Sequence, residues 1–130
     1  MNYKVLGLFG IIIITVAVTF QIFHHAPETF SGTAEVSEIT PKMIGVVRET
    51  RGIVLNLNEG KGNIFFTLKD VNTDKKIKGV IFSKTNVNNP EFKNLLIQSR
   101  DEKSVIFLNG EIDVYKGELE IKTWQVFKND

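Results

Sequence analysis

The stretch from Asn63 to Asp70 constrains the fold of this chain more than any other. Its side chains alternate with a period of two, which is the repeat of a β-strand that buries one face in a core. One face of the alternation is apolar and consists of Ile64, Phe66 and Leu68. The other face carries Phe65, Thr67 and Lys69. The stretch therefore predicts a strand in a small β-core, with an aromatic ring beside a cation on its outer face.

The N-terminal segment has a different character, because residues 5–23 contain no charged side chain and only one strongly polar residue, Gln21. A helix of this length, rising about 1.5 Å per residue, comes close to the roughly 30 Å hydrocarbon core of a bilayer. A cleaved signal peptide has a shorter apolar region with a small-x-small site just after it, and Phe23-His24-His25 is a poor match to such a site. We therefore expect residues 1–25 to form an uncleaved signal-anchor helix that spans the membrane once.

Charges around this apolar segment predict its orientation. Lys4 precedes it, whereas the next basic residue, Lys42, comes only after Glu28, Glu35 and Glu38. The positive-inside rule then places the rest of the chain outside the cytoplasm. Residues 26–42 have a proline near each end and no sustained period, so we expect a linker there and a folded domain over residues 43–130.

The pattern of the folded part predicts five strands and one short helix. Strands are expected at Ile44–Leu57, Asn63–Asp70, Lys75–Phe82, Ser104–Tyr115 and Glu118–Phe127, and a helix at Glu91–Gln98. Gly52, within the first strand, marks a bulge or a sharp coil. Three strands, a helix and a hairpin are the order of an all-β, five-stranded Greek-key barrel of the OB type. We therefore predict such a barrel, with one short helix between its third and fourth strands. The transmembrane helix precedes the barrel in the chain.

The strands also carry five short motifs, at residues 51–54, 65–70, 77–82, 109–112 and 115–121. In order and spacing, across about residues 44–127, these motifs resemble the nucleic-acid-binding OB-fold domain family of the anticodon-binding and exonuclease VII type. Phe65-Phe66-Thr67-Leu68-Lys69-Asp70 resembles the Phe-x-x-Leu-Arg-Asp strand of class II synthetase anticodon domains, with Lys in place of Arg. The resemblance implies that Phe65 stacks on a base and that Lys69 contacts a phosphate or a base. No synthetase or nuclease catalytic domain accompanies the motifs, so those activities are not expected.

Charge restricts how such a domain binds a polyanion, because 16 basic residues, Lys4 included, face 15 acidic ones. Local patches must supply the attraction, and residues 61–84 hold six lysines against two aspartates. The last hairpin is acidic and disfavours a phosphate backbone. The candidate nucleic-acid-binding residues are Phe65, Thr67, Lys69, Lys76, Lys78, Tyr115 and Lys116. Purely structural interpretations stay open for Phe65 and for the lysines. Phe65 could add to the core, and the lysines could form a solvated sheet edge that discourages aggregation.

Catalytic and metal chemistry have little support in the sequence. The chain has no cysteine and only two histidines, at positions 24 and 25. Asp70-x-Asn72-x-Asp74 opens like a calcium loop, but Lys75 and Ile81 occupy the positions that require Gly and Glu, which favours a plain Asx turn. We expect no catalytic residues, no metal site, no cofactor and no enzymatic activity.

Two functions follow from these patterns. The first is a membrane-anchored OB module that binds single-stranded nucleic acid by aromatic stacking and lysine–phosphate contacts on its second and third strands. The alternative is an exported envelope protein whose barrel binds a protein partner or an oligosaccharide, and the predicted topology favours it because nucleic acid is scarce outside the cytoplasm. Its layout resembles that of the membrane-bound haem chaperone of cytochrome c maturation. That family carries a His near the end of its barrel, whereas residues 121–127 contain none, so haem binding is not expected.

Overall fold

The computed structural model describes residue 30 and residues 32–129. The expected membrane anchor at residues 1–25 lies outside these described residues. Within them, no helix is both long and apolar enough to cross a bilayer. Residues 32–129 belong to one compact unit.

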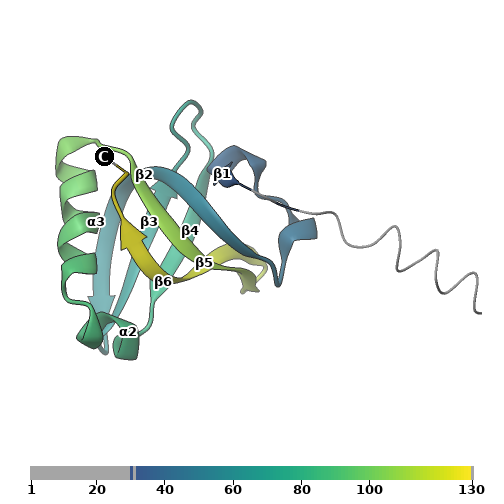
Figure 1. Ribbon diagram of the computed structural model, residues 1–130. Coiled ribbons are helices and arrows are strands. Elements are labelled where there is room, and N and C mark those ends of the chain that lie inside the picture. The colour runs from purple at the N-terminus through teal and green to yellow at the C-terminus, as the bar shows by residue number, and fades with distance from the viewer. Residues whose placement is uncertain (1–29, 31, 130) are drawn as a thin grey trace, which may run out of the picture. The chain divides into compact units, whose positions relative to one another are not determined.

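Five strands close the barrel that the sequence predicts (Figure 1). They are β2 (Val47–Gly60), β3 (Asn63–Lys69), β4 (Lys76–Ile81), β5 (Ile106–Tyr115) and β6 (Glu118–Phe127). Four pairings are antiparallel: β2 with β3, β3 with β4, β5 with β6, and β2 with β5. β4 and β6 run parallel, which places β6 between β4 and β5 and closes the barrel. This is the Greek-key order of an OB barrel.

β2 belongs to both halves of the barrel and bends at Gly52. Residues 47–52 pair with β5, whereas pairing with β3 begins at Ile53. A Cβ atom at Gly52 would lie 2.6 Å from Leu68 Cγ and 2.6 Å from the Lys69 carbonyl oxygen, so only glycine permits this close crossing. The sharp coil expected at Gly52 is therefore present, whereas the bulge lies three residues later, between Val54 and Asn56.

The inward face of the strands forms the core. Ile64, Phe66 and Leu68 of β3 are buried as predicted. On β5, Leu108 is buried as the alternation predicts, but Val114, at the same phase, is 45% exposed. The reason is its place in the barrel: Val114 pairs with Leu119, and the pairing of β6 with β4 begins only at Glu120. Val114 therefore lies beyond the closed part of the barrel.

The segment between β4 and β5 contains two helices, α2 (Ser83–Asn88) and α3 (Glu91–Glu102), rather than the single one predicted. α2 escaped prediction because none of its residues is buried, so it has no apolar period. α3 runs four residues further than predicted. Its buried Ser99 accepts a hydrogen bond from the Val54 amide at 3.0 Å and donates one to the Ser104 carbonyl at 2.7 Å, which ties α3 to the bulge of β2.

The sequence predicted a linker over residues 26–42, but part of this segment belongs to the barrel domain. β1 (Thr33–Glu35) pairs parallel with residues 49–51 of β2, followed by the short 3₁₀ helices η1 (Val36–Glu38) and η2 (Pro41–Met43). Ala34 is completely buried. A three-residue strand is too short for its alternation to be recognised, so sequence patterns missed this sixth strand.

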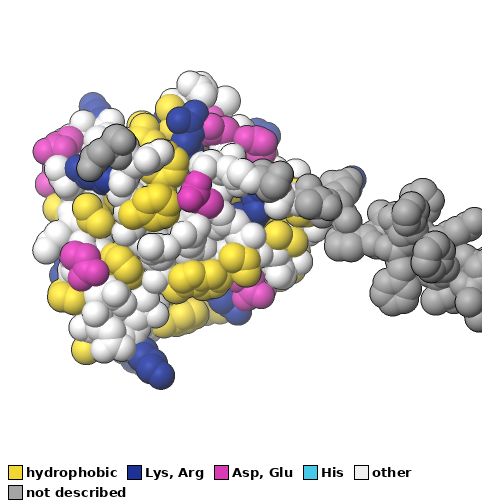
Figure 2. All heavy atoms as spheres, in the orientation of Figure 1, with side chains coloured by type: hydrophobic (Ala, Val, Ile, Leu, Met, Phe, Trp, Pro, Cys, Tyr) yellow, Lys and Arg dark blue, Asp and Glu magenta, His cyan; other side chains and the backbone are white. Residues whose placement is uncertain are grey.

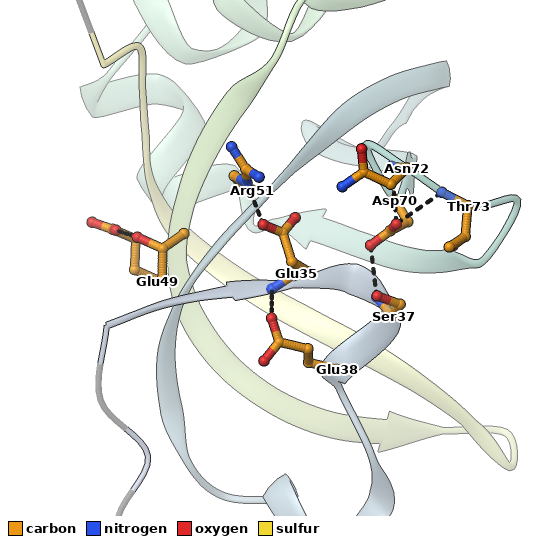
Figure 3. A network of polar contacts seen from close by, with 9 residues as sticks. Glu35, Ser37, Glu38, Glu49, Arg51, Asp70, Asn72 and Thr73 are labelled. Atoms are coloured by element: carbon orange, nitrogen blue, oxygen red, sulfur yellow. Dashed lines mark hydrogen bonds and ion pairs between the residues drawn. The ribbon is translucent and has the colours of Figure 1, made fainter.

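Asp70 holds η1 against the β3–β4 turn (Figure 3). Its carboxylate is buried and accepts hydrogen bonds from the amides of Ser37 at 2.9 Å, Asn72 at 3.0 Å and Thr73 at 2.9 Å. The last two bonds form the predicted Asx turn. Burial by itself raises the pKa of the Asp70 carboxyl, but these hydrogen bonds outweigh it and lower the pKa to about 2.

Candidate nucleic-acid interface

The outer faces of β3 and β4 bring the predicted binding residues into cross-strand pairs. Phe65 lies opposite Val80, Thr67 opposite Lys78, and Lys69 opposite Lys76. Directly opposite residues on antiparallel strands share a face, so these six side chains project from the same side of the sheet. The parallel neighbour β6 extends the rows, because Lys78 lies opposite Glu120 and Val80 opposite Lys122.

A cavity of about 540 Å³, which we call the aromatic cleft, opens on this face. Its lining residues are Asn58, Phe65, Phe66, Thr67, Lys78, Gly79, Val80, Phe82, Asp113, Tyr115, Glu120 and Lys122. Three of its rings are partly open to solvent: Phe65 is 44% exposed, Phe82 49% and Tyr115 61%. Val80 has the outward phase of β4 but is only 1% exposed, so it is the apolar floor between them. The structural interpretation of Phe65 as buried core does not hold.

Gly79 explains why Phe66 points inward and Phe65 outward. The two residues lie opposite each other, Phe66 on β3 and Gly79 on β4. A Cβ atom at Gly79 would stand 2.2 Å from the Phe66 ring, so the missing side chain is the space that Phe66 occupies in the core. With Phe66 seated there, the alternation of β3 presents Phe65 on the outer face.

A second cavity of about 510 Å³, the lysine hollow, adjoins the aromatic cleft where β4 and β6 begin. Its lining residues are Val36, Ile39, Thr67, Lys75, Lys76, Ile77, Lys78, Glu118 and Leu119. Thr67 and Lys78 line both cavities, so the two lie side by side. We call the pair the groove.

Ion pairs neutralise much of the groove's positive charge. Lys78 Nζ lies 2.6 Å from a Glu118 carboxylate oxygen, and Lys122 Nζ lies 2.7 Å from one of Asp113. Hydrogen bonding to Glu118 raises the pKa of Lys78, and hydrogen bonding to Lys122 lowers the pKa of Asp113. Partial burial, and then the nearby charge of Asp113, raise the pKa of Glu120.

The remaining cations stand at one end of the groove. Among its described lining residues, four lysines face three carboxylates, and only Lys75 and Lys76 stand outside an ion pair. On the face shown in Figure 2, too, positive and negative side chains are interspersed among hydrophobic ones. The groove therefore offers aromatic surface and local positive charge, but no strong overall attraction for a polyanion.

The groove includes five of the seven predicted binding residues: Phe65, Thr67, Lys76, Lys78 and Tyr115. Lys69 lies outside it and donates a hydrogen bond to the Asp70 carbonyl at 2.8 Å. Lys116 also lies outside, in the β5–β6 turn, with Nζ 5.4 Å from the centre of the Tyr115 ring. Lys69 and Lys116 therefore do not line the groove.

Sequence reasoning missed Val80 and Phe82 of the aromatic cleft, and it did not place the acidic residues of β5 and β6 in its wall. A signal for Phe82 was present, because a period of two through Lys78 and Val80 places it on the same outward face. The β6 residues had no such signal, since the pairing of β4 with β6 joins segments that are far apart in the chain.

The part of the chain that the structure describes contains no candidate metal site, because no three His, Cys, Asp or Glu side chains cluster there so as to hold an ion. The expected absence of a cofactor and of catalysis stays a prediction.

No protein-family model matches this chain, and no curated protein matches it by sequence. Solved structures do. OBody AM1L10 bound to hen egg-white lysozyme is 18% identical with a TM-score of 0.55, over 81% of this chain and 98% of the OBody. The chain has the OB fold.

Two tRNA synthetases share this fold over a small part of their length. The asparaginyl-tRNA synthetase from Pyrococcus horikoshii, complexed with asparaginyl-adenylate, is 15% identical with a TM-score of 0.51, over 75% of this chain and 22% of the enzyme. The aspartyl-tRNA synthetase from Entamoeba histolytica is 14% identical with a TM-score of 0.51, over 77% and 26%. At these identities the likeness concerns the fold of one part of each enzyme.

Proposed function

We propose that this protein is an OB-fold binding module that holds single-stranded nucleic acid in the groove and is anchored to a membrane through residues 5–23. The observation that carries the proposal is the half-exposed Phe65 ring, set in an aromatic cleft beside a hollow that contains two lysines outside any ion pair among the described residues. Support also comes from the motif at residues 65–70 and from the OB fold, which recurs in enzymes named for a tRNA substrate.

Binding energy in this groove has two separable sources. Stacking of bases on Phe65, Phe82 and Tyr115 contributes about 1–3 kcal/mol per base and varies little with salt. Contacts of Lys75 and Lys76 with phosphates release counterions, and each neutralised phosphate adds about 0.7 to the slope of log affinity against log salt. Since the other groove lysines are already paired, we expect a shallow salt slope and an affinity that is micromolar at best.

The experiment that tests this function measures anisotropy of a fluorescent single-stranded oligonucleotide of mixed sequence. Its length of about 12 nucleotides is within the site size of one OB fold. The full chain is held in non-ionic detergent and titrated at several salt concentrations. Phe65→Ala should weaken binding by about 5- to 150-fold, the equivalent of one lost stack, and leave the salt slope unchanged. Trp124→Ala is the matched control, because Trp124 is 45% exposed but lies outside the groove.

The lysines are tested in the same assay. Changing both Lys75 and Lys76 to Ala should flatten the salt slope by about 1.4, the value for two phosphate contacts. Lys84→Ala, an exposed lysine of α2 outside the groove, should leave the slope unchanged. Absence of salt-dependent binding at low ionic strength, or equal losses for Phe65→Ala and Trp124→Ala, would refute the nucleic-acid function.

The near balance of charge in the groove favours a second candidate, an exported module that binds a protein partner or an oligosaccharide. Exposed rings around a desolvated apolar floor are typical of protein-binding hot spots. The OBody with the same fold is bound to a protein, lysozyme. Retention of a cell-envelope protein by the full chain, lost on Phe65→Ala, in the absence of any oligonucleotide binding would support this candidate.

A further inference from the structure

The ion pair between Lys78 and Glu118 occupies the junction of the groove's two cavities. Lys78 lines both cavities, and Glu118 lines the lysine hollow beside it. The ammonium and the carboxylate oxygen are 2.6 Å apart, and the two side chains are 63% and 61% exposed. A solvent-exposed pair of this kind is screened by water and easily exchanged. Because Glu118 neutralises the ammonium, Lys78 offers its full charge to a ligand only when Glu118 gives way.

The hairpin turn places this glutamate. Lys116 and Gly117 both have positive φ, 51° and 79°, which makes a tight two-residue connection between β5 and β6. Glu118 is then the first residue of β6 and has the same outward phase as Glu120, the residue that lies opposite Lys78. From this position its carboxylate reaches Lys78 diagonally across the parallel junction of β4 and β6.

The other ion pair of the groove is held differently. Lys122 has two acidic neighbours, Asp113 at 2.7 Å and Glu111 at 4.0 Å. Its side chain is 40% exposed and that of Asp113 33%. Loss of one carboxylate leaves Lys122 with the other. Lys78 has Glu118 as its one ion-pair partner among the described residues and otherwise keeps only the longer-range attraction of Glu120, which lies opposite it. Glu118 is therefore the carboxylate whose departure leaves a groove lysine without an ion-pair partner.

Building on the proposed function, we propose that Glu118 is an internal competitor for phosphate at Lys78. An incoming phosphate oxygen replaces the carboxylate on the ammonium, so one ionic contact is exchanged for another and a ligand made only of phosphates gains little. A ligand that also stacks a base in the aromatic cleft keeps the stacking energy in addition. Glu118 thus lowers the gain from phosphate contacts for every ligand. A single strand that also stacks a base then still binds, whereas duplexes and polyphosphates, which offer mainly phosphates to the groove, bind too weakly to be held.

The test compares Glu118→Gln with the control Glu111→Gln. The control makes the same chemical change on the same hairpin, but Lys122 keeps its closer partner, Asp113. Three probes are titrated against the full chain in non-ionic detergent: a single-stranded oligonucleotide, the duplex of the same sequence, and inorganic tripolyphosphate. For Glu118→Gln we expect affinity for duplex and tripolyphosphate to rise about fivefold at low salt, the equivalent of one exposed ion pair. The single-strand salt slope should become steeper by about 0.7, the value for one additional phosphate contact. Glu111→Gln should behave as the wild type.

Two outcomes distinguish this inference from the proposed function. If the wild type binds the single strand and Glu118→Gln changes neither the salt slope nor the affinity for duplex and tripolyphosphate, the competitor role is refuted and the function stands. If no oligonucleotide binds but Glu118→Gln gains affinity for tripolyphosphate, the competitor role stands and the nucleic-acid function falls.

The variant Glu118→Gln with Lys78→Ala shows whether the gain depends on Lys78. A gain that persists without Lys78 reflects overall charge alone and refutes the competitor role. Failure of the wild type and Glu118→Gln to bind any probe refutes the role and the function together.

Discussion

Replacement of Asp70 by Asn should destabilise the domain in a pH-dependent way. The buried carboxylate accepts three amide hydrogen bonds, one from η1 and two from the β3–β4 turn (Figure 3). Its pKa falls from 3.8 to about 2 in the folded protein, which corresponds to about 2 kcal/mol of stabilisation of the folded state. Because the folded pKa is the lower one, this contribution is complete above about pH 5 and is lost as the pH falls towards 2.

Urea unfolding of the full chain in non-ionic detergent, followed by the fluorescence of its only tryptophan, Trp124, measures this effect. At pH 7, Asp70→Asn should be less stable than the wild type by about 2 kcal/mol, since an amide oxygen replaces only one of two acceptors. The difference should shrink as the pH is lowered from 4 to 2. Asp74→Asn, an exposed residue of the same turn, is the control and should change stability by less than about 0.5 kcal/mol.

Hydrogen exchange locates the same effect in the structure. Asp70 is the acceptor for the Ser37 amide, so the amide protons of residues 33–38 should exchange faster in Asp70→Asn than in the wild type. A stability difference between Asp70→Asn and the wild type that is the same at pH 7 and pH 2 would refute the assigned role of the carboxylate.

Three further outcomes are expected. Leu108→Ala should lower the free energy of unfolding by about 2–5 kcal/mol, because the Leu108 side chain is completely buried. Val114→Ala should lower it by less than about 0.5 kcal/mol, because Val114 is 45% exposed. Equal losses in urea unfolding would contradict the assigned faces of β5. Gly79→Ala should lower the free energy of unfolding by about 1–3 kcal/mol, because the new methyl group meets the Phe66 ring. Phe66→Leu in the same chain should restore part of this loss. No recovery would mean that the clash lies elsewhere. The full-length protein should stay in the membrane fraction after carbonate washing, because residues 5–23 are long and apolar enough to span a bilayer; a soluble mature form that begins near Glu35 would instead indicate a cleaved signal.

Local patterns in the sequence determined the strands and their faces. The alternation of residues 63–69 predicted which side of β3 is buried. The predicted strands ending at Tyr115 and beginning at Glu118 left two residues for the last turn, as the structure has it. Both predictions depend on residues that are neighbours in the chain. The order of strands and helix was enough to predict the OB barrel, since few topologies accommodate it. Phe65 on the outer face followed from the same alternation and is present in the structure.

The tertiary structure alone decided what surrounds Phe65. β6 pairs with β4 across more than 40 residues of sequence, so the Lys78–Glu118 ion pair and the balanced charge of the groove had no local signal. The sequence did not predict β1, because three residues are too few to show an alternation. Their burial also depends on β2, a strand that follows later in the chain. Periodicity reports which face of an element is buried, whereas the partner on the other face depends on how distant segments pack together.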